Sequence, residues 1–174
     1  SNVETKIITE LTRDNLQLVA HALRHGDVVA IPTETVYGLG ANGLDADAMD
    51  KIYAAKGRPS DNPLILHVPN AESIKPLVKE IPETAKALIE AFWPGPLTIT
   101  LPKSDLVPDR ATGGLARVAL RCPDHAVCRN ILELAGVPIA APSANISGRP
   151  SPTTAQSVYD DMNGRIPYIV DAGI

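Results

Sequence analysis

The sequence is poor in aromatic residues and cysteines, and it contains no apolar run long enough to cross a membrane. Aromatic side chains make up 3% of the 174 residues, so Leu, Ile, Val and Ala must form most of the core. Two cysteines are too few to predict a disulfide framework. No charged segment followed by an apolar stretch begins the chain, and we therefore expect a cytoplasmic protein without a membrane partner.

Basic residues are also scarce relative to acidic ones. The chain has 16 Lys and Arg against 20 Asp and Glu, which gives a formal net charge of −4. This excess of negative charge argues against a protein whose main task is to coat nucleic acid, although it is compatible with a local basic patch. We expect weak, salt-sensitive nucleic-acid binding at most.

What the sequence does contain is a globular composition and an alternating pattern of helices and strands. Hydrophobic residues make up 44% of the chain, and its length suits one domain. The pattern predicts helices at 13–25, 46–56, after Asn70, 83–92, 125–135 and 154–163, and strands at 28–31, 64–68, 97–101, 117–121, 138–141 and 168–170. This alternation predicts a single α/β domain around a central sheet, with the long gap 102–116 as a functional loop.

Residues 51–68, KIYAAKGRPSDNPLILHV, place basic and polar side chains in a stiff loop between a helix and a strand. Lys56 and Arg58 lie at the end of the helix, where cations also suit the helix dipole. Two prolines stiffen the loop and Asn62 adds a neutral donor, so the segment has the composition of a clamp for phosphate or carboxylate. His67 in the following strand either belongs to this clamp or is a hydrogen-bonded core residue.

Two further stretches put hydroxyl and amide groups at the expected ends of strands. Thr33, Glu34 and Thr35 follow the strand at 28–31, and the segment APSANISGRPSPTT begins where the strand at 138–141 ends. Ligands of open α/β sheets commonly bind at the carboxyl ends of strands. Each stretch also suits a turn whose hydroxyls cap the next helix, and the residues alone leave both interpretations open.

Two patterns imitate known sites without meeting their requirements. Gly38, Gly40 and Gly43 match the dinucleotide fingerprint G-x-G-x-x-G, but that fingerprint begins where a strand ends, and here PTETVY intervenes. The two cysteines and the histidine of CPDHAVC (122–128) lie close together, but their spacing fits no common zinc motif. We therefore expect neither a nicotinamide or flavin site nor a resident metal ion.

Five blocks occur in order along the chain: PTETVYGLG, KGRPSDNPLILHV, WPGPLTITL, RVALRCPDH and PIAAPSANISGRPSPT. Together they resemble the signature blocks of the YrdC-like family, the threonylcarbamoyl-AMP synthases, over residues 12–173. The resemblance implies an α/β domain with a large twisted mixed sheet, flanked by helices, around a concave cavity. It also implies a nucleotidyltransferase that converts ATP, L-threonine and bicarbonate into L-threonylcarbamoyladenylate and pyrophosphate. Downstream proteins would use that product to form N6-threonylcarbamoyladenosine in tRNA.

The same resemblance assigns roles to individual residues. Those implied to bind threonine are Thr35, His67, Arg121 and Ala141. Those implied to bind ATP are Lys56, Arg58, Asn62, Ser143, Asn145 and Ser151, of which Lys56 and Arg58 are also implied to be catalytic. We expect Mg²⁺ to accompany ATP, because two cations do not neutralise three phosphates, and we expect no permanently bound cofactor.

The chain departs from the family pattern in two places. Arg117 stands where relatives often have a small hydroxyl residue near the nucleotide, and the chain stops at DAGI, where relatives continue into a Ser-containing segment. The resemblance thus predicts a YrdC-like domain over residues 1–174 that lacks its last segment and has no second domain. Two alternatives to the synthase are a carbamoyl-adenylate-forming maturation domain of the same fold and a non-catalytic module that binds double-stranded RNA.

Overall fold

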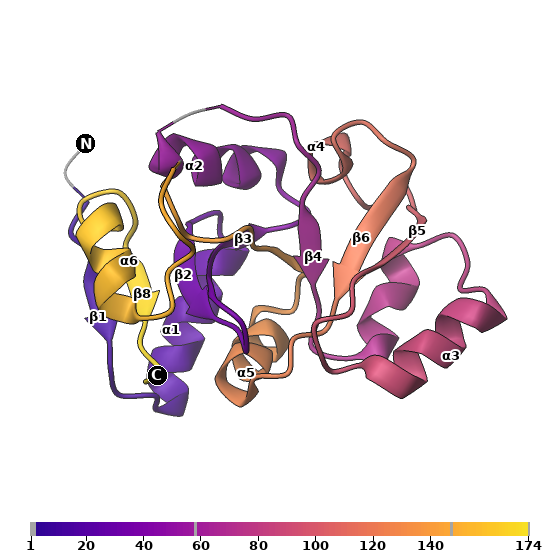
Figure 1. The fold of residues 1–174 in the computed structure, drawn as a ribbon, viewed down its shortest axis with the longest axis horizontal. Coiled ribbons are helices and arrows are strands. Elements are labelled where there is room, and N and C mark those ends of the chain that lie inside the picture. Colours follow the sequence, from indigo (N-terminus) through magenta and orange to yellow (C-terminus); the bar gives the residue numbers. More distant parts are fainter. Residues whose placement is uncertain (1–2, 58, 147, 174) are drawn as a thin grey trace.

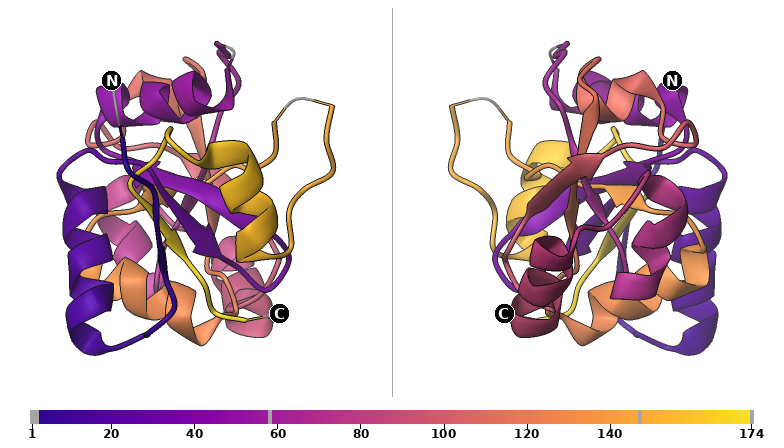
Figure 2. Two further views of the ribbon diagram at one scale, coloured as in Figure 1. Left: turned by 90° about the vertical axis from the view of Figure 1, so that its left-hand side faces the viewer. Right: turned by 90° about the vertical axis from the view of Figure 1, so that its right-hand side faces the viewer.

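A mixed eight-stranded sheet runs through the computed structural model, which describes residues 3–57, 59–146 and 148–173, and helices cover both faces (Figures 1 and 2). The strand order is β1-β8-β2-β3-β7-β4-β6-β5. The strands are β1 (Lys6–Ile8), β2 (Val29–Pro32), β3 (Tyr37–Asn42), β4 (Ile65–His67), β5 (Ile99–Pro102), β6 (Arg117–Arg121), β7 (Ile139–Ala140) and β8 (Tyr168–Val170). The helices are α1 (Arg13–Arg24), α2 (Ala46–Lys56), η1 (Ala71–Leu77), α3 (Glu83–Phe92), α4 (Asp109–Thr112), α5 (Ala126–Ala135) and α6 (Ala155–Met162). The predicted fold class is confirmed.

The middle of the sheet is buried on both faces, which explains why its strands are short continuous apolar runs. Val29 and Ile31 of β2 pack with α1 and α5, whereas Ala30 between them faces the larger core cluster on the other side. Figure 2 shows α1 and α5 on one side of the sheet and α6 on the other. Side chains of a strand alternate between faces, so one apolar run supplies both cores.

Local sequence signals determine where α2 begins and ends. Asp45 caps the helix by accepting the backbone N–H of Ala48 at 3.1 Å. Gly57 ends it in the left-handed conformation at φ 86°, which glycine adopts without a steric penalty. Lys56 is therefore held at the last turn of a well-defined helix, as the sequence predicts.

The glycine-rich segment after residue 36 forms a buried strand, β3, which is absent from the predicted strands. Strand β3 pairs with both β2 and β7, in the middle of the sheet. A Cβ at Gly40 would lie 3.0 Å from Ile139 Cγ2, and one at Gly43 would lie 2.7 Å from Leu66 Cδ2. The glycines that imitate a dinucleotide fingerprint are thus required by close packing around the strand.

Three other differences concern elements near the edges. Strand β1 and helix α4 are not predicted, because they are too short to show a period, and α4 falls inside the gap 102–116. The apolar face of α3, which carries Ala85, Leu88, Ile89 and Phe92, is only partly covered, since Leu88 is 43% and Phe92 57% exposed. Among the described residues, no helix is long and apolar enough to span a membrane.

Candidate active site

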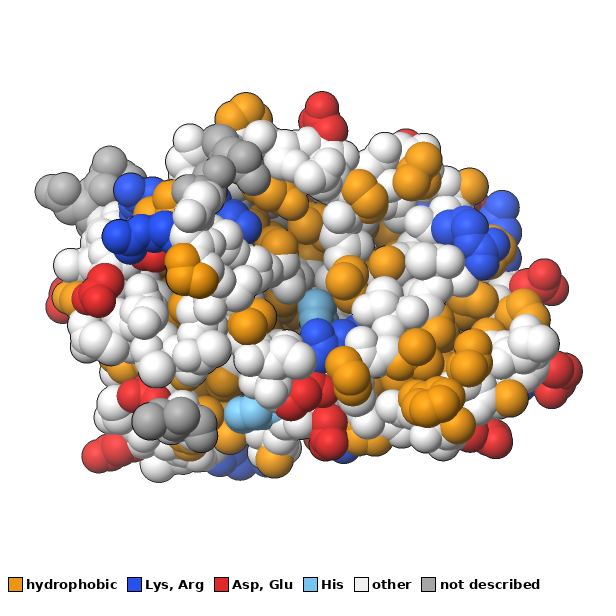
Figure 3. Space-filling model, in the orientation of Figure 1, with side chains coloured by type: hydrophobic (Ala, Val, Ile, Leu, Met, Phe, Trp, Pro, Cys, Tyr) orange, Lys and Arg blue, Asp and Glu red, His pale blue; other side chains and the backbone are white. Residues whose placement is uncertain are grey.

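The centre of the site is a pair of side chains on neighbouring strands. His67 ends β4 and Arg121 ends β6, and the two residues are partners in the parallel register of these strands. Both residues therefore lie at the carboxyl ends of neighbouring parallel strands, where ligands of open α/β sheets commonly bind. Near the middle of the face shown in Figure 3, a histidine, a basic and an acidic side chain lie side by side over this part of the sheet.

His67 is buried and electrically neutral near pH 7. Burial first, and after it the neighbouring Arg121 cation, lower the pKa of His67 to about 4, against the opposing effect of two backbone carbonyls and Glu34. Its Nδ1 atom lies 3.2 Å from the carbonyl oxygens of both Ile65 and Ile139. Because both neighbours are acceptors, Nδ1 must donate, and Nε2 is then an acceptor. The imidazole is suited to accept a hydrogen bond from a hydroxyl or amino group.

Arg121 is held by a carboxylate that the sequence alone does not identify as its partner. Its NH2 atom forms an ion pair with Glu34, and its Nε atom donates to the Gly95 carbonyl at 3.3 Å. The other carboxylate oxygen of Glu34 accepts the backbone N–H of Asp124 at 2.7 Å. The Arg121 and Glu34 side chains are 12% and 21% exposed, so water screens their charges only partly. Glu34 follows a buried strand, which is the one sequence signal that could have identified it.

Thr35 lies in the turn between β2 and β3, next to Glu34. Thr33 Oγ1 accepts the backbone N–H groups of Thr35 and Val36, each at 3.2 Å, and lies 3.0 Å from Thr35 Oγ1. These bonds stabilise the turn in the way expected of a capping hydroxyl. Thr33, Glu34 and Thr35 also line a cavity of about 240 Å³. The turn interpretation of this stretch is therefore confirmed for the Thr33 hydroxyl, and the ligand-binding interpretation stays a prediction.

The segment that follows β7 links this pair to the end of α2. The backbone N–H of Ala141 lies 3.4 Å from the Ile65 carbonyl, beside β4. Two residues on, the Ser143 carbonyl accepts the ammonium group of Lys56 at 2.9 Å. The structure thus brings the predicted amino-acid residues and the predicted phosphate residue Lys56 to opposite ends of one short segment, Ile139 to Ser143.

The other predicted ATP-binding residues lie on two loops. Asn62 is exposed on the loop after α2, and Ser151 is exposed on the segment before α6, which extends away from the body of the molecule in Figure 2. Asn145 has a role inside its own loop, because its Oδ1 accepts the Ser143 hydroxyl and its Nδ2 lies 3.2 Å from the Arg149 carbonyl. Arg58 lies outside the described residues.

The cysteine and histidine group at 122–128 has a structural explanation. His125 caps α5 by accepting the backbone N–H of Cys128 at 3.2 Å through Nδ1. Burial raises the pKa of the Cys128 thiol to about 12, so this sulfur is a neutral thiol at pH 7. Within the described residues, no group of three or more His, Cys, Asp and Glu side chains is placed to hold a metal ion.

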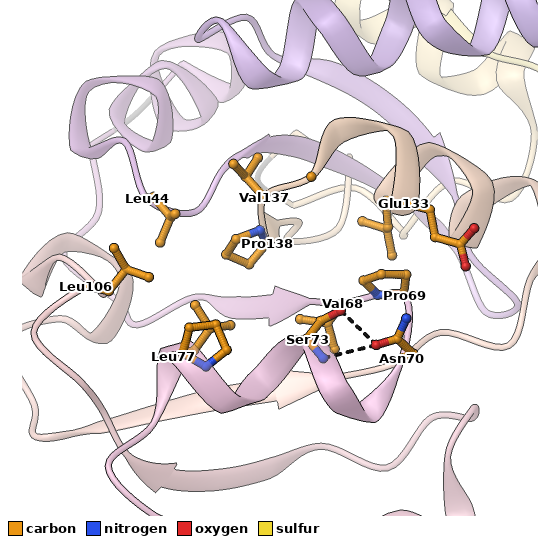
Figure 4. Close-up of a pocket in the computed structure, with 13 residues that line it drawn as sticks. Leu44, Val68, Pro69, Asn70, Ser73, Leu77, Leu106, Glu133, Val137 and Pro138 are labelled. Carbon is orange, nitrogen blue, oxygen red and sulfur yellow. Dashed lines mark hydrogen bonds between the residues drawn. The ribbon is translucent and has the colours of Figure 1, made fainter.

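A further cavity of about 310 Å³ lies apart from the site, between η1 and the residues after α5 (Figure 4). Its walls are mainly apolar, with Leu77 on one side and Val137 and Pro138 on the other. At its rim, Asn70 Oδ1 accepts a hydrogen bond from the backbone N–H of Ser73 at 3.0 Å. None of the predicted site residues that the structure describes lines this cavity.

The geometry defines a class of protein: an α/β domain in which a guanidinium and a neutral imidazole meet at the ends of neighbouring strands, and a helix-terminal lysine contacts the far end of the Ile139–Ser143 segment. A model of the Sua5/YciO/YrdC family, described as "Telomere recombination", matches residues 21–174. The chain belongs to this family, as the sequence resemblance predicts.

Relatives and solved structures agree with this membership. A threonylcarbamoyl-AMP synthase of Pyrococcus abyssi is 55% identical over 158 residues, covering 91% of this chain and 46% of the relative. One of Bacillus subtilis is 52% identical over 170 residues, covering 96% of this chain and 49% of the relative. The crystal structure of P. abyssi Sua5 complexed with L-threonine superposes with a TM-score of 0.90 at 52% identity, covering 97% of this chain and 50% of that one. The chain thus spans about half the length of these relatives.

Proposed function

We propose that this protein is an L-threonylcarbamoyladenylate synthase. It converts ATP, L-threonine and bicarbonate into threonylcarbamoyl-AMP, pyrophosphate and water. Identities of 52–55% to proteins with the synthase name support this activity over the maturation-domain alternative. A negative net charge of −4 counts against the alternative of a non-catalytic RNA-binding module.

The observation that carries the proposal is the short segment from Ile139 to Ser143, which touches both halves of the site. At one end the Ile139 carbonyl oxygen lies 3.2 Å from His67 Nδ1. At the other end the Ser143 carbonyl oxygen lies 2.9 Å from Lys56 Nζ. An amino acid beside His67 and Arg121 would therefore lie next to a nucleotide held at Lys56. The reaction needs these two ligands side by side, because one attacks the other.

The chain's residues would contribute by positioning and by charge. Arg121 pairs with the threonine carboxylate, Ala141 borders the amino acid through its backbone, and Thr35 and His67 hydrogen-bond its polar groups. The amine takes up bicarbonate carbon to give a carbamate and water. A carbamate oxygen then attacks the α-phosphorus, and the pyrophosphate leaves.

At the nucleotide end, Lys56 and Arg58 stabilise the negative charge on the phosphates in the transition state. The proposed ATP ligands Asn62, Ser143, Asn145 and Ser151 supply amide and hydroxyl groups. No protein nucleophile is required. Mg²⁺ would arrive with ATP, held by phosphate oxygens and water, since the proposed ATP ligands include no carboxylate.

Downstream tRNA-modifying proteins would receive the product, which places the activity in the cytoplasm. The chain itself has no need to hold tRNA, and the cations at residues 56, 58 and 121 are already assigned to small anions. We expect tRNA dissociation constants on the order of 10⁻⁴ to 10⁻⁶ M at physiological salt. Titration of labelled tRNA at two salt concentrations measures this, and nanomolar binding that persists at high salt would contradict it.

Pyrophosphate release is the direct test of the proposed activity. With the full-length protein, ATP and Mg²⁺, we expect release only when L-threonine and bicarbonate are both present. Removal of Mg²⁺ with a chelator should abolish it. Release that depends on carbamoyl phosphate in place of threonine would identify the maturation-domain activity instead, and equal turnover without threonine would rule out the synthase.

A further inference from the structure

The loop after α2 is fastened by an arginine from the unpredicted helix α4. Arg110 donates through NH2 to the Ser60 carbonyl at 2.7 Å and through NH1 to the Asn62 carbonyl at 3.3 Å. Its Nε donates to Asp50 Oδ1 at 2.8 Å, and its guanidinium lies 5.0 Å from the centre of the Tyr53 ring. One side chain thereby joins α4, the loop and α2, which lie together in Figure 1.

The chemistry of these contacts favours arginine specifically. A guanidinium is planar and its N–H groups have fixed directions, so two carbonyls that it binds are fixed relative to each other. Asp50 and Tyr53 in turn fix the guanidinium, through an ion pair and through the face of an aromatic ring. Both belong to α2, whose last residue is Lys56. A lysine at position 110 would supply a single point charge and could not make the same set of contacts.

Backbone contacts between α4 and the same loop support this arrangement. The Leu64 N–H donates to the Ala111 carbonyl at 2.8 Å. Gly113 has a left-handed φ of 61°, and a Cβ there would lie 2.8 Å from the Asp61 carbonyl oxygen and 3.2 Å from Pro63 Cδ. The turn after α4 therefore fits closely against residues 61–63, and any side chain at Gly113 would push the loop away.

We propose that Arg110 is a positioning residue for nucleotide binding: it holds the carbonyls of Ser60 and Asn62 so that the loop is ordered before ATP arrives. The proposal rests on the function proposed above, in which Lys56 and Asn62 bind ATP. It also gives the gap 102–116 a specific role, as the support of that loop. A binding loop that is ordered in advance does not lose conformational freedom when the ligand binds, which improves affinity.

Loss of the Arg110 side chain should weaken nucleotide binding and leave amino-acid binding unchanged. Arg110 contacts α2 and the loop, whereas the amino-acid residues His67 and Arg121 lie on β4 and β6. Its side chain borders an existing cavity of about 530 Å³, which Asp50, Tyr53 and Ser60 also line. Removing the guanidinium would enlarge that cavity and leave the core clusters unchanged, so the variant should fold.

The test is to measure two affinities in the full-length protein carrying Arg110→Ala or Arg110→Lys. By calorimetry with Mg²⁺ and a non-hydrolysable ATP analogue, we expect the dissociation constant to rise roughly ten- to a hundredfold in both variants. The dissociation constant for L-threonine, measured without nucleotide, should stay within about twofold of wild type, because the amino-acid residues are untouched. Asp50→Asn, which leaves the guanidinium without its ion pair, should produce a smaller change in the same direction.

Arg24→Ala is the matched control. It also removes one positive charge and one guanidinium-to-carbonyl bond, from Arg24 NH1 to Ala135 at 3.3 Å, but between α1 and α5. We expect wild-type affinity for both ligands. Unchanged ATP-analogue affinity in Arg110→Ala would overturn the proposal, and so would parallel loss of both ligands with a lower melting temperature. Wild-type protein that binds no ATP analogue would instead refute the proposed function itself.

Discussion

Acidification should destabilise the protein through His67. Burial, followed by the effect of Arg121, lowers the pKa of His67 from 6.5 to about 4 in the folded state. In the unfolded chain the imidazole takes up a proton near pH 6.5, so between pH 6.5 and pH 4 the unfolded state binds more protons. The stability that is fully present above pH 6.5 is therefore lost as the pH falls toward 4. At pH 5 the loss amounts to about 2 kcal/mol, from about 1.4 kcal/mol for each pH unit.

Urea unfolding at pH 7.5 and pH 5 measures this effect, with His67→Asn as the comparison. Asn cannot titrate, so the free energy of unfolding of the wild type should fall by about 2 kcal/mol more than that of the variant between the two pH values. The variant is expected to be less stable at both pH values. This does not affect the test, because only the change in the free energy of unfolding between the two pH values is compared. Equal losses in wild type and His67→Asn would refute the reasoning.

Three further predictions concern catalysis, affinity and packing. Arg58→Ala should lower turnover by roughly two to four orders of magnitude, as loss of a charge contact in the transition state does, and a normal rate of pyrophosphate release would contradict its assignment. Thr35→Ala should weaken threonine binding by about 1–3 kcal/mol in calorimetry, the cost of one lost hydrogen bond, and unchanged affinity would remove Thr35 from the site. Gly43→Ala should lower the free energy of unfolding by about 1–3 kcal/mol, because its Cβ would lie 2.7 Å from Leu66 Cδ2 and 3.0 Å from the Pro138 carbonyl oxygen. Urea unfolding indistinguishable from wild type would show that this contact relaxes without cost.

The elements that the sequence predicts well are those whose signals are local. The sequence predicts both ends of helix α2, because the capping residues Asp45 and Gly57 act on residues one turn away or less. Strand β5 shows its two faces in the alternation of buried Ile99 and Leu101 with exposed Thr100. The sequence does not predict strand β3, because its glycines Gly38 and Gly40 are explained mainly by the close approach of residues 139–142, which lie far away in the sequence. Long-range packing is the part of the fold that a single sequence conceals.

The candidate site divides in the same way. Position at a strand end suggests Thr35, whereas the family resemblance is what points to His67 and Arg121, and the register of β4 with β6 does bring the last two together. The partners of these residues come from elsewhere in the chain. Glu34 reaches Arg121 across 87 positions, and nothing in the sequence pairs them. Arg110 is equally hidden, since it lies in a helix of 4 residues that has no period to detect.

Charge balance at the site suits the proposed order of events. Arg121 and Glu34 together are neutral, and the lowered pKa of His67 keeps the imidazole neutral beside them, so a zwitterionic amino acid binds without a net charge being buried. Conversion of its ammonium group to a carbamate removes a positive charge and adds a negative one. The bound species then becomes a dianion next to a site that holds one carboxylate already. In the proposed reaction Glu34 would repel that new charge, whereas Lys56, which contacts the Ser143 carbonyl, would attract it, and this difference would favour attack of the carbamate on the nucleotide.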